Sequence, residues 1–205
     1  ASEAQRAITE IYSGIMAVPT KLLRSWLARL DNQNAQGEYY LTDVIGLLRS
    51  SGRSVHALKA SDPLEALGVN TIRELGEVAR LLRERRVEAL MAAGVVLEDP
   101  ETTHVGLDVT AEADAVLRPF TILEGRTSVA AGAVVGPFAR LVDAQIGPGA
   151  QVLDHCLLRE CVVEAGASVG PFAHIRPQSV IGARAKVGNF VELKKTSLGR
   201  RSKAN

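Results

Sequence analysis

Apolar residues recur every six positions in the C-terminal half of the chain, from about Val105 onward. Five-residue steps from Leu141 to Ile146 and from Leu158 to Val163 are breaks in this phase. Three six-residue units make one triangular coil of about 18 residues, and each coil buries its apolar side only against its neighbours. The pattern therefore predicts a parallel β-helix of hexapeptide repeats from about Val105 to the end of the chain. Its expected inward residues are Val116, Ile122, Val129, Val135, Leu141, Ile146, Val152, Leu158, Val163, Val169, Ile175, Ile181, Val187 and Leu193.

Residues 71–94 show a different spacing, which predicts a long helix. Thr71-Ile72-Arg73-Glu74 has the form of a capping box, in which the Thr hydroxyl and the Glu carboxylate satisfy free backbone N–H groups. Gly94 stands at the expected C′ position. The apolar face is expected to comprise Leu75, Val78, Leu82, Val87, Leu90 and Met91. A capped, charged helix between two different patterns indicates a connector between domains.

Residues 1–70 read as alternating strand and helix. The apolar run 13–18, closed by Pro19, suits a buried strand, and residues 54–58 alternate as a second strand would. Leu22, Leu23, Trp26, Leu27 and Leu30 form one helical stripe, and Thr42 or Asp43 can cap a second helix. These few strands predict an α/β segment that is part of a larger domain.

Composition narrows the classes of function. The chain has 24 Lys and Arg residues against 23 Asp and Glu, which gives no electrostatic reason to expect a nucleic acid or an anionic membrane as partner. No apolar run approaches the length of a membrane span. Cys156 and Cys161 are too few for a disulfide framework and are expected to be free thiols in a reducing cytoplasm.

Longer motifs carry a resemblance to a known family. In chain order they are Asn34-Ala35-Gln36-Gly37-Glu38-Tyr39-Tyr40-Leu41-Thr42-Asp43, Gly68-Val69-Asn70, Gly170-Pro171-Phe172-Ala173, Ile175-Arg176-Pro177, Val187-Gly188-Asn189-Phe190-Val191-Glu192-Leu193-Lys194-Lys195 and Ser202-Lys203-Ala204. Together they resemble the bacterial bifunctional N-acetylglucosamine-1-phosphate uridyltransferase/glucosamine-1-phosphate acetyltransferase, of which this chain would be a central fragment.

The resemblance implies an α/β nucleotidyltransferase remnant over residues 1–70, a connector helix over 71–94 and part of a left-handed acetyltransferase β-helix over 95–205. Such enzymes acetylate glucosamine 1-phosphate with acetyl-CoA and couple the product, N-acetylglucosamine 1-phosphate, to UTP with Mg²⁺. The UDP-N-acetylglucosamine formed feeds peptidoglycan and, in Gram-negative bacteria, lipopolysaccharide. The resemblance also implies a cytoplasmic homotrimer.

Four residues of the N-terminal segment match sugar-nucleotide-binding positions of the family. Asn70 matches the Mg²⁺-binding asparagine, and a neutral carbonyl oxygen suits such a hard cation. Tyr40 and Thr42 match residues that contact the sugar, whereas Tyr12 replaces the family's asparagine with a bulky phenol. Read without the family, Asn70 would cap a turn, and Tyr40 and Thr42 would be a strand end and a helix cap.

In the β-helix, Arg176 and Lys194 match the basic residues that bind the sugar phosphate. A guanidinium grips phosphate oxygens bidentately, and an ammonium adds a point charge. Gln178 replaces the family's Gly after Arg-Pro, so the turn that supports Arg176 is expected to change shape. The basic residues Arg200, Arg201 and Lys203 either meet CoA phosphates or form a solvated charged end.

By the same resemblance, the nucleotide-binding Gly-rich loop lies before Ala1 and the general-base histidine lies just beyond Asn205. No catalytic residue is therefore assigned within the chain, and these 205 residues alone are expected to catalyse neither reaction.

Two other functions remain open on the sequence. One is a zinc-dependent hexapeptide-repeat carbonic anhydrase, because His155 and His174 are about one coil apart; such a site needs three histidines. The other is a non-catalytic β-helix scaffold, which explains the repeat but not the motifs between Asn34 and Asn70.

Overall fold

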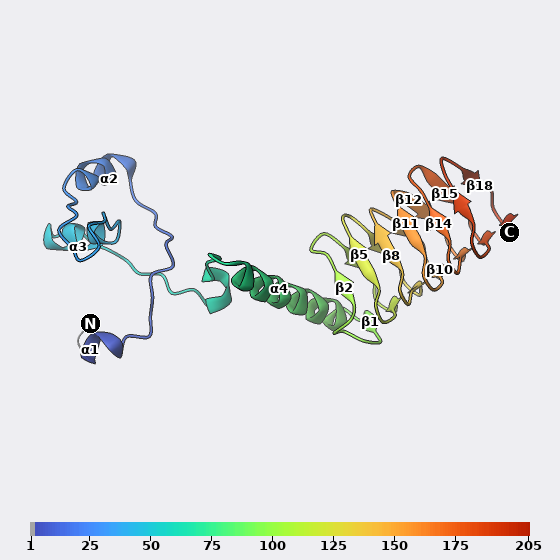
Figure 1. The fold of residues 1–205 in the computed structure, drawn as a ribbon, viewed down its shortest axis with the longest axis horizontal. Coiled ribbons are helices and arrows are strands. Elements are labelled where there is room, and N and C mark those ends of the chain that lie inside the picture. The colour runs from blue at the N-terminus through green and yellow to red at the C-terminus, as the bar shows by residue number, and fades with distance from the viewer. Residues whose placement is uncertain (1–2) are drawn as a thin grey trace. The chain divides into compact units, whose positions relative to one another are not determined.

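The computed structural model describes residues 3–205 (Figure 1). It divides into two compact units, one ending at Glu74 and one running from Leu75 to Asn205. Within the described residues the helices are α1 (Glu3–Arg6), α2 (Thr20–Leu27), α3 (Asp43–Ser50), a 3-10 helix at Pro63–Ala66 and α4 (Ile72–Ala92). The boundary between the units therefore falls in the first turn of α4.

The N-terminal unit is organised around α2 and α3, which contact each other. Trp26 on α2 and Val44 on α3 are buried, and the guanidinium of Arg29 lies 4.3 Å from the centre of the Trp26 ring. Both helices lie where the apolar stripe and the Thr42/Asp43 start signal predict them, and Thr42 is the N-cap residue of α3. The Thr42 side chain makes no capping hydrogen bond, so packing rather than the cap holds this helix.

The prediction of two strands in this unit is wrong. Residues 13–18 and 54–58 are irregular in the structure, and their apolar side chains Ile15 and Leu58 are 78% and 98% exposed. A strand requires a neighbour that satisfies its backbone N–H and C=O groups. Residues 3–74, as described, contain no strand that could serve as that neighbour. An apolar run alone was therefore not enough to form a strand here.

The capping box at the start of α4 is confirmed. The Glu74 carboxylate accepts hydrogen bonds from the backbone N–H groups of Asn70 (2.6 Å) and Thr71 (2.9 Å), and Glu74 N–H donates to the Thr71 hydroxyl (3.2 Å). The helix ends at Ala92, and Gly94 follows it at the expected C′ position, where its φ of +90° allows the left-handed turn that a side chain would disfavour.

The predicted apolar face of α4 is only partly buried. Val87 and Leu90 join the hydrophobic core of the second unit, whereas Leu75, Leu82 and Met91 are 56%, 43% and 47% exposed. Arg86 adds a hydrogen bond from its guanidinium to the carbonyl of Val109 in the first coil. Only the C-terminal end of α4 therefore packs on the strands that follow it.

The second unit is a parallel β-solenoid with one sheet on each side of a triangular coil (Figure 1). One sheet comprises β1 (Val96–Leu97), β4 (Val116–Leu117), β7 (Val134–Val135), β10 (Gln151–Val152), β13 (Ser168–Val169), β16 (Lys186–Val187) and β19 (Lys203–Ala204). A second comprises β2 (His104–Val105), β5 (Ile122–Glu124), β8 (Arg140–Val142), β11 (Leu157–Arg159), β14 (His174–Ile175) and β17 (Glu192–Leu193). The third comprises β3 (Thr110–Ala111), β6 (Ser128–Val129), β9 (Gln145–Ile146), β12 (Cys161–Val163), β15 (Ser179–Ile181) and β18 (Ser197–Leu198).

The hexapeptide prediction is confirmed by the strand register. Successive coils advance it by 20, 18, 17, 17, 18 and 17 residues along the first sheet. Every predicted inward residue from Val129 to Val187 is buried. The prediction that Val116 and Ile122 point inward is wrong by one position, because Leu117 and Leu123 are the fully buried residues. A one-residue shift moves a strand side chain to the opposite face.

Two glycines allow neighbouring coils to approach closely. A Cβ on Gly147 would lie 2.8 Å from the backbone N of Ala165, and one on Gly182 would lie 2.7 Å from the carbonyl O of Leu198. Neither glycine has a positive φ, so these positions are needed for space rather than for the conformation of a corner.

The corners themselves are formed by other residues in the left-handed conformation. At one corner five of them stack their rings in consecutive coils, with centroid separations of 4.8, 4.8, 4.8 and 5.1 Å. This corner stack comprises Phe120, Phe138, His155, Phe172 and Phe190, whose φ angles lie between +55° and +59°. The separations match the spacing of paired strands, so each coil places its ring directly over the previous one.

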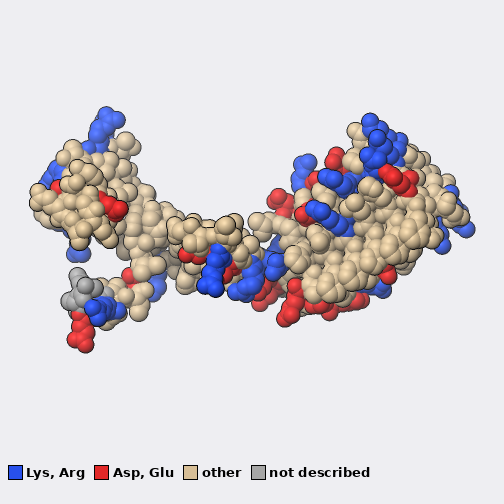
Figure 2. Space-filling model, in the orientation of Figure 1, with Lys and Arg blue, Asp and Glu red and all other residues tan. Residues whose placement is uncertain are grey.

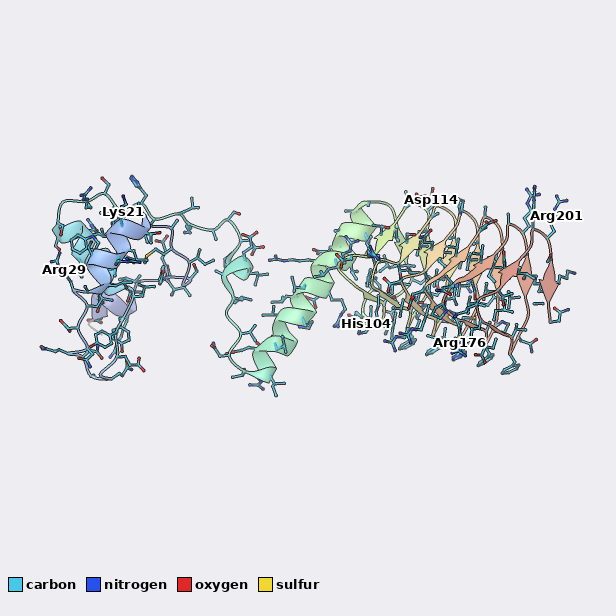
Figure 3. All side chains as sticks on the ribbon, turned by 90° about the horizontal axis from the view of Figure 1, so that it is seen from above. Lys21, Arg29, His104, Asp114, Arg176 and Arg201 are labelled. Carbon is cyan, nitrogen blue, oxygen red and sulfur yellow. The ribbon has the colours of Figure 1, made fainter. Side chains whose placement is uncertain are left out.

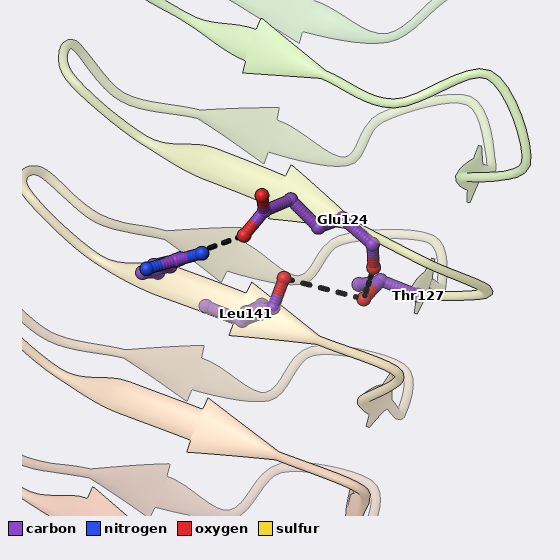
Figure 4. Close-up of polar contacts among 4 residues, drawn as sticks. Glu124, Thr127 and Leu141 are labelled. Carbon is purple, nitrogen blue, oxygen red and sulfur yellow. Dashed lines mark hydrogen bonds and ion pairs between the residues drawn. The ribbon is translucent and has the colours of Figure 1, made fainter.

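Polar contacts also repeat between coils. The Thr127 hydroxyl donates to the carbonyl of Glu124 at 2.6 Å and lies 3.5 Å from the carbonyl of Leu141 in the next coil (Figure 4). The Arg140 side chain donates to the Glu124 carboxylate at 2.6 Å.

Among the described residues, no helix has the length and apolar character required to cross a membrane.

Candidate functional site

Of the four candidate residues of the N-terminal unit, Thr42 lines a hollow that does not include the other three. Thr42 lies on a shallow hollow beside α2 and α3, whose lining is Arg29, Leu30, Asp31, Thr42, Asp43, Gly46 and Leu47. Tyr12, Tyr40 and Asn70 are not part of that lining. Thr42 is therefore the one candidate that the hollow includes.

The remaining three candidates have local roles or are exposed. The Tyr40 hydroxyl donates a hydrogen bond to the side-chain carbonyl of Gln36. Tyr12 is 41% exposed, and Asn70 lies at the start of α4, where its backbone N–H donates to Glu74. The Asn70 side chain is exposed, so its carbonyl oxygen is available to a ligand.

Fitting Mg²⁺ to this unit requires more oxygen ligands than Asn70 supplies. Mg²⁺ is usually bound through one or two carboxylates together with substrate phosphates and water. The nearby Glu74 carboxylate is already used to cap α4. Among residues 3–205 no group of three or more His, Cys, Asp or Glu side chains lies close enough to hold a metal ion. These residues therefore do not form a magnesium site by themselves.

Arg176 and Lys194 occupy matching positions in adjacent coils. The paired residues Ile175 and Leu193 belong to β14 and β17, and each candidate immediately follows one of them. Arg176 N–H continues the ladder by donating to the carbonyl of Leu193 at 2.9 Å. Figure 3 shows Arg176 on the outside of the coils, on the same side as His104 of the same sheet. The fold thus places a guanidinium and an ammonium side by side on one exposed face.

Glu192 is a residue of this cluster that sequence reasoning missed. Its carboxylate accepts a hydrogen bond from Arg176 at 2.8 Å. That hydrogen bond, and then the charges of Arg176, His174 and Lys194, hold the pKa of Glu192 below its ordinary value. The sequence signal for this ion pair is a separation of 16 residues, which Glu124 and Arg140 also have. These coils are 18 residues long, and a diagonal neighbour on the next strand is two residues nearer in sequence than the directly paired one.

Gln178 keeps a regular corner after Arg176. Its φ is +63°, which is the conformation that the family's Gly would adopt freely. Glu160 and Lys195, in the preceding and following coils, also have positive φ. Gln178 N–H donates to the carbonyl of Glu160 at 3.0 Å. The turn at Gln178 therefore has the left-handed conformation of the corresponding corners in the two neighbouring coils.

The last coils are strongly basic. Residues 176–205 contain eight Lys and Arg residues but one acidic residue, Glu192, whereas residues 95–124 contain seven acidic residues and one Arg. Figure 2 shows Lys and Arg side chains gathered over the C-terminal coils. Arg200, Arg201 and Lys203 are exposed members of this group. Their arrangement favours anionic ligands at this end of the solenoid without identifying one.

In the described structure both cysteines are buried, and His155 is stacked between aromatic rings. Cys156 and Cys161 are buried free thiols, and burial raises the pKa of Cys161 to about 12 and that of Cys156 above its ordinary value. Their thiols are therefore poor nucleophiles at neutral pH. The ring of His155 is stacked between Phe138 and Phe172, an arrangement that gives the zinc-site alternative no support.

Comparison with known proteins agrees with the motifs. A family model described as "Bacterial transferase hexapeptide (six repeats)" matches residues 160–195, which include Arg176 and Lys194. The "Bifunctional protein GlmU" of Streptomyces avermitilis is 45% identical over 203 residues, 99% of this chain and 42% of that protein. The protein of the same name from Brevibacillus brevis is 44% identical over 199 residues, 97% of this chain and 43% of that protein.

These matches confirm the resemblance over nearly the whole chain, which spans about two fifths of the length of those relatives. Among solved structures, a mutant of perosamine N-acetyltransferase from Caulobacter crescentus aligns with 72% of this chain and 85% of its own. Its sequence identity is 20% and its TM-score is 0.36, too low for this likeness to carry an argument.

Proposed function

Because the chain is homologous to the bifunctional GlmU proteins along nearly its whole length, we propose that it serves UDP-N-acetylglucosamine biosynthesis. In this proposal the solenoid contributes to the transfer of an acetyl group from acetyl-CoA to the amine of glucosamine 1-phosphate. The N-terminal unit contributes to the transfer of a uridylyl group from UTP to the N-acetylglucosamine 1-phosphate formed. A left-handed coil, a homotrimer and a cytoplasmic location belong to the same proposal.

The observation that carries the proposal is the placement of Arg176 and Lys194 in neighbouring coils of one exposed sheet. A phosphate monoester carries a charge of about −1.5 to −2 at neutral pH and offers three acceptor oxygens. A guanidinium that binds two of these oxygens fixes the orientation of the phosphate, and the adjacent ammonium balances its remaining charge. The role of this pair is to bind and orient the sugar phosphate.

Glu192 adds a condition to this binding step. Its carboxylate holds Arg176 when no phosphate is bound, so an incoming phosphate must compete with it for the guanidinium. Because Arg176 and Glu192 have side chains that are 39% and 55% exposed, solvent weakens this ion pair. A dianionic phosphate next to Lys194 is then the stronger ligand.

In the N-terminal unit, Tyr40 and Thr42 are proposed to contact the sugar, and Tyr12 stands at a third contact position. Asn70 is proposed to supply a neutral oxygen to Mg²⁺, whose chemistry is to neutralise the phosphates of UTP. Since the described residues do not form a complete magnesium site, no step of the reaction is assigned to the metal.

Calorimetric titration of the 205-residue chain with glucosamine 1-phosphate tests the proposal. We expect saturable binding that is weakened about tenfold or more by Arg176→Gln and by Lys194→Gln. Arg118→Gln is the matched control, because Arg118 is an exposed arginine of another sheet whose carboxylate partner, Glu98, is 3.7 Å away. Absence of binding to the unaltered chain, or equal affinity in all three variants, would contradict the proposal.

A further inference from the structure

The face that carries Arg176 contains a third cation in the same column. Leu158 pairs with Ile175, and Ile175 pairs with Leu193. Arg159, Arg176 and Lys194 each follow one of these residues, so they stand in three consecutive coils on the same side of the same sheet. Paired strands are separated by about 4.8 Å, which is short compared with the reach of these side chains. Arg176 is therefore flanked by a cation on each side.

The partners of these cations differ along the face. Diagonal neighbours on successive strands form the ion pairs Glu124–Arg140 and Arg176–Glu192. The equivalent neighbour of Arg159 is His174, which is not an acid. Among the residues that the structure describes, the exposed side chain of Arg159 has no ion pair or hydrogen bond. Arg159 therefore lacks the carboxylate that Arg140 and Arg176 each have as a diagonal neighbour.

Charge balance indicates what this position can bind. Arg176 shares its charge with Glu192, so Arg176 and Lys194 together leave a net charge of about +1 for a phosphate monoester of about −1.5 to −2. Arg159 supplies the missing positive charge, and His174 lies between it and Glu192 on the same face. A phosphate placed over Arg176 could receive hydrogen bonds from both flanking cations.

We propose that Arg159 is a further phosphate-binding residue, which extends the sugar-phosphate site by one coil toward the N-terminus and favours dianionic phosphate monoesters. The inference rests on the proposed function, since it takes Arg176 and Lys194 as the centre of that site. In this arrangement Arg176 orients the phosphate, while Arg159 and Lys194 neutralise it from opposite sides.

The test compares the binding of glucosamine 1-phosphate and of inorganic phosphate to the full 205-residue chain by calorimetry and by ³¹P NMR. Arg159→Gln is expected to weaken both ligands about fivefold to tenfold and to reduce the dependence of affinity on salt. Arg159→Lys, which retains the charge, is expected to recover part of the loss. Arg140→Gln is the matched control on the same sheet, because its arginine is already bound to Glu124.

Thermal unfolding of each variant establishes that the solenoid remains folded, as the exposure of Arg159 leads us to expect. If Arg176→Gln abolishes binding while Arg159→Gln binds as the unaltered chain does, the inference is overturned and the proposed function stands. Equal weakening by Arg159→Gln and Arg140→Gln also overturns it, because the effect would then be one of net charge alone. If the unaltered chain binds neither ligand, the proposed function and this inference fail together.

Discussion

The two units of this chain differ in how far their apolar residues are buried. In the solenoid, Leu141, Leu158 and Ile175 are completely buried, whereas in the N-terminal unit Ile11 and Leu58 are 88% and 98% exposed. A strand of two or three residues suffices in the solenoid because its partner lies one coil away in the same chain. The apolar segments of the N-terminal unit have no such partner among residues 3–74.

This difference shows that an apolar run specifies a buried strand only where a second strand can pair with it. The solenoid gains stability from each interface between neighbouring coils. The N-terminal unit depends on a few contacts between α2 and α3, with Trp26 and Val44 as its buried apolar residues in the described structure. Substitutions chosen in pairs, one in each unit, test this contrast.

The largest difference is expected for apolar residues truncated to alanine. Ile175→Ala removes a fully buried side chain from the solenoid core and should cost about 2–5 kcal/mol in the free energy of unfolding. Leu58→Ala removes an exposed side chain and should change it by less than about 0.5 kcal/mol. Urea unfolding followed by circular dichroism measures both. A loss of unfolding free energy for Leu58→Ala comparable to that for Ile175→Ala would show that Leu58 is buried in solution. It would contradict the difference between the two units.

Glycine substitutions should differ in sign between the units. A Cβ at position 182 meets backbone atoms of the next coil, so Gly182→Ala should destabilise the solenoid by about 1–3 kcal/mol. Gly46 lies inside α3 with no atom within 4 Å of the added Cβ, so Gly46→Ala should stabilise that helix by about 0.5–1 kcal/mol. Thermal unfolding of both variants gives the comparison, and two changes of the same sign would refute it.

The smallest effect is expected at Glu74, beside the boundary between the units. Its pKa is lowered chiefly by the hydrogen bonds from Asn70 and Thr71, so the folded value lies below the unfolded one. The stabilisation is present above the ordinary pKa of a glutamate and is lost as pH falls through the lowered value. We expect the protection of the Asn70 and Thr71 amides, measured by NMR as the intrinsic exchange rate divided by the observed rate at the same pH, to fall over that range, whereas Glu74→Gln should abolish this change in protection. Protection at these two amides that does not change with pH in the unaltered chain would contradict this cap.

The elements that the sequence predicted correctly are those whose signals repeat along the chain or act locally. Period six identified the solenoid, and continuing it backward from Val129 would have corrected Ile122 to Leu123 and Val116 to Leu117. The capping box at Thr71 and the C′ glycine bounded α4 because both signals act over one helical turn. The strands expected at residues 13–18 and 54–58 failed because pairing depends on a distant segment that local pattern does not report.

The candidate site was predictable to the same limited extent. Arg176 and Lys194 were identified by family motifs, and the register then placed them in adjacent coils. Glu192 and Arg159 could be related to them only after the length of each coil was known. Coil length varies from 17 to 20 residues, so side-chain neighbours across coils cannot be assigned from a constant period.

The corner stack gives the solenoid an internal spectroscopic reporter. The imidazole of His155 lies between Phe138 and Phe172, with ring centres 4.8 Å away on each side. Protons held over the faces of two benzene rings experience aromatic ring currents, which move their NMR resonances to lower frequency. The resonances of His155 therefore report the alignment of three consecutive coils, and ligand binding or a mutation that shifts one coil against the next would be visible there without any added label.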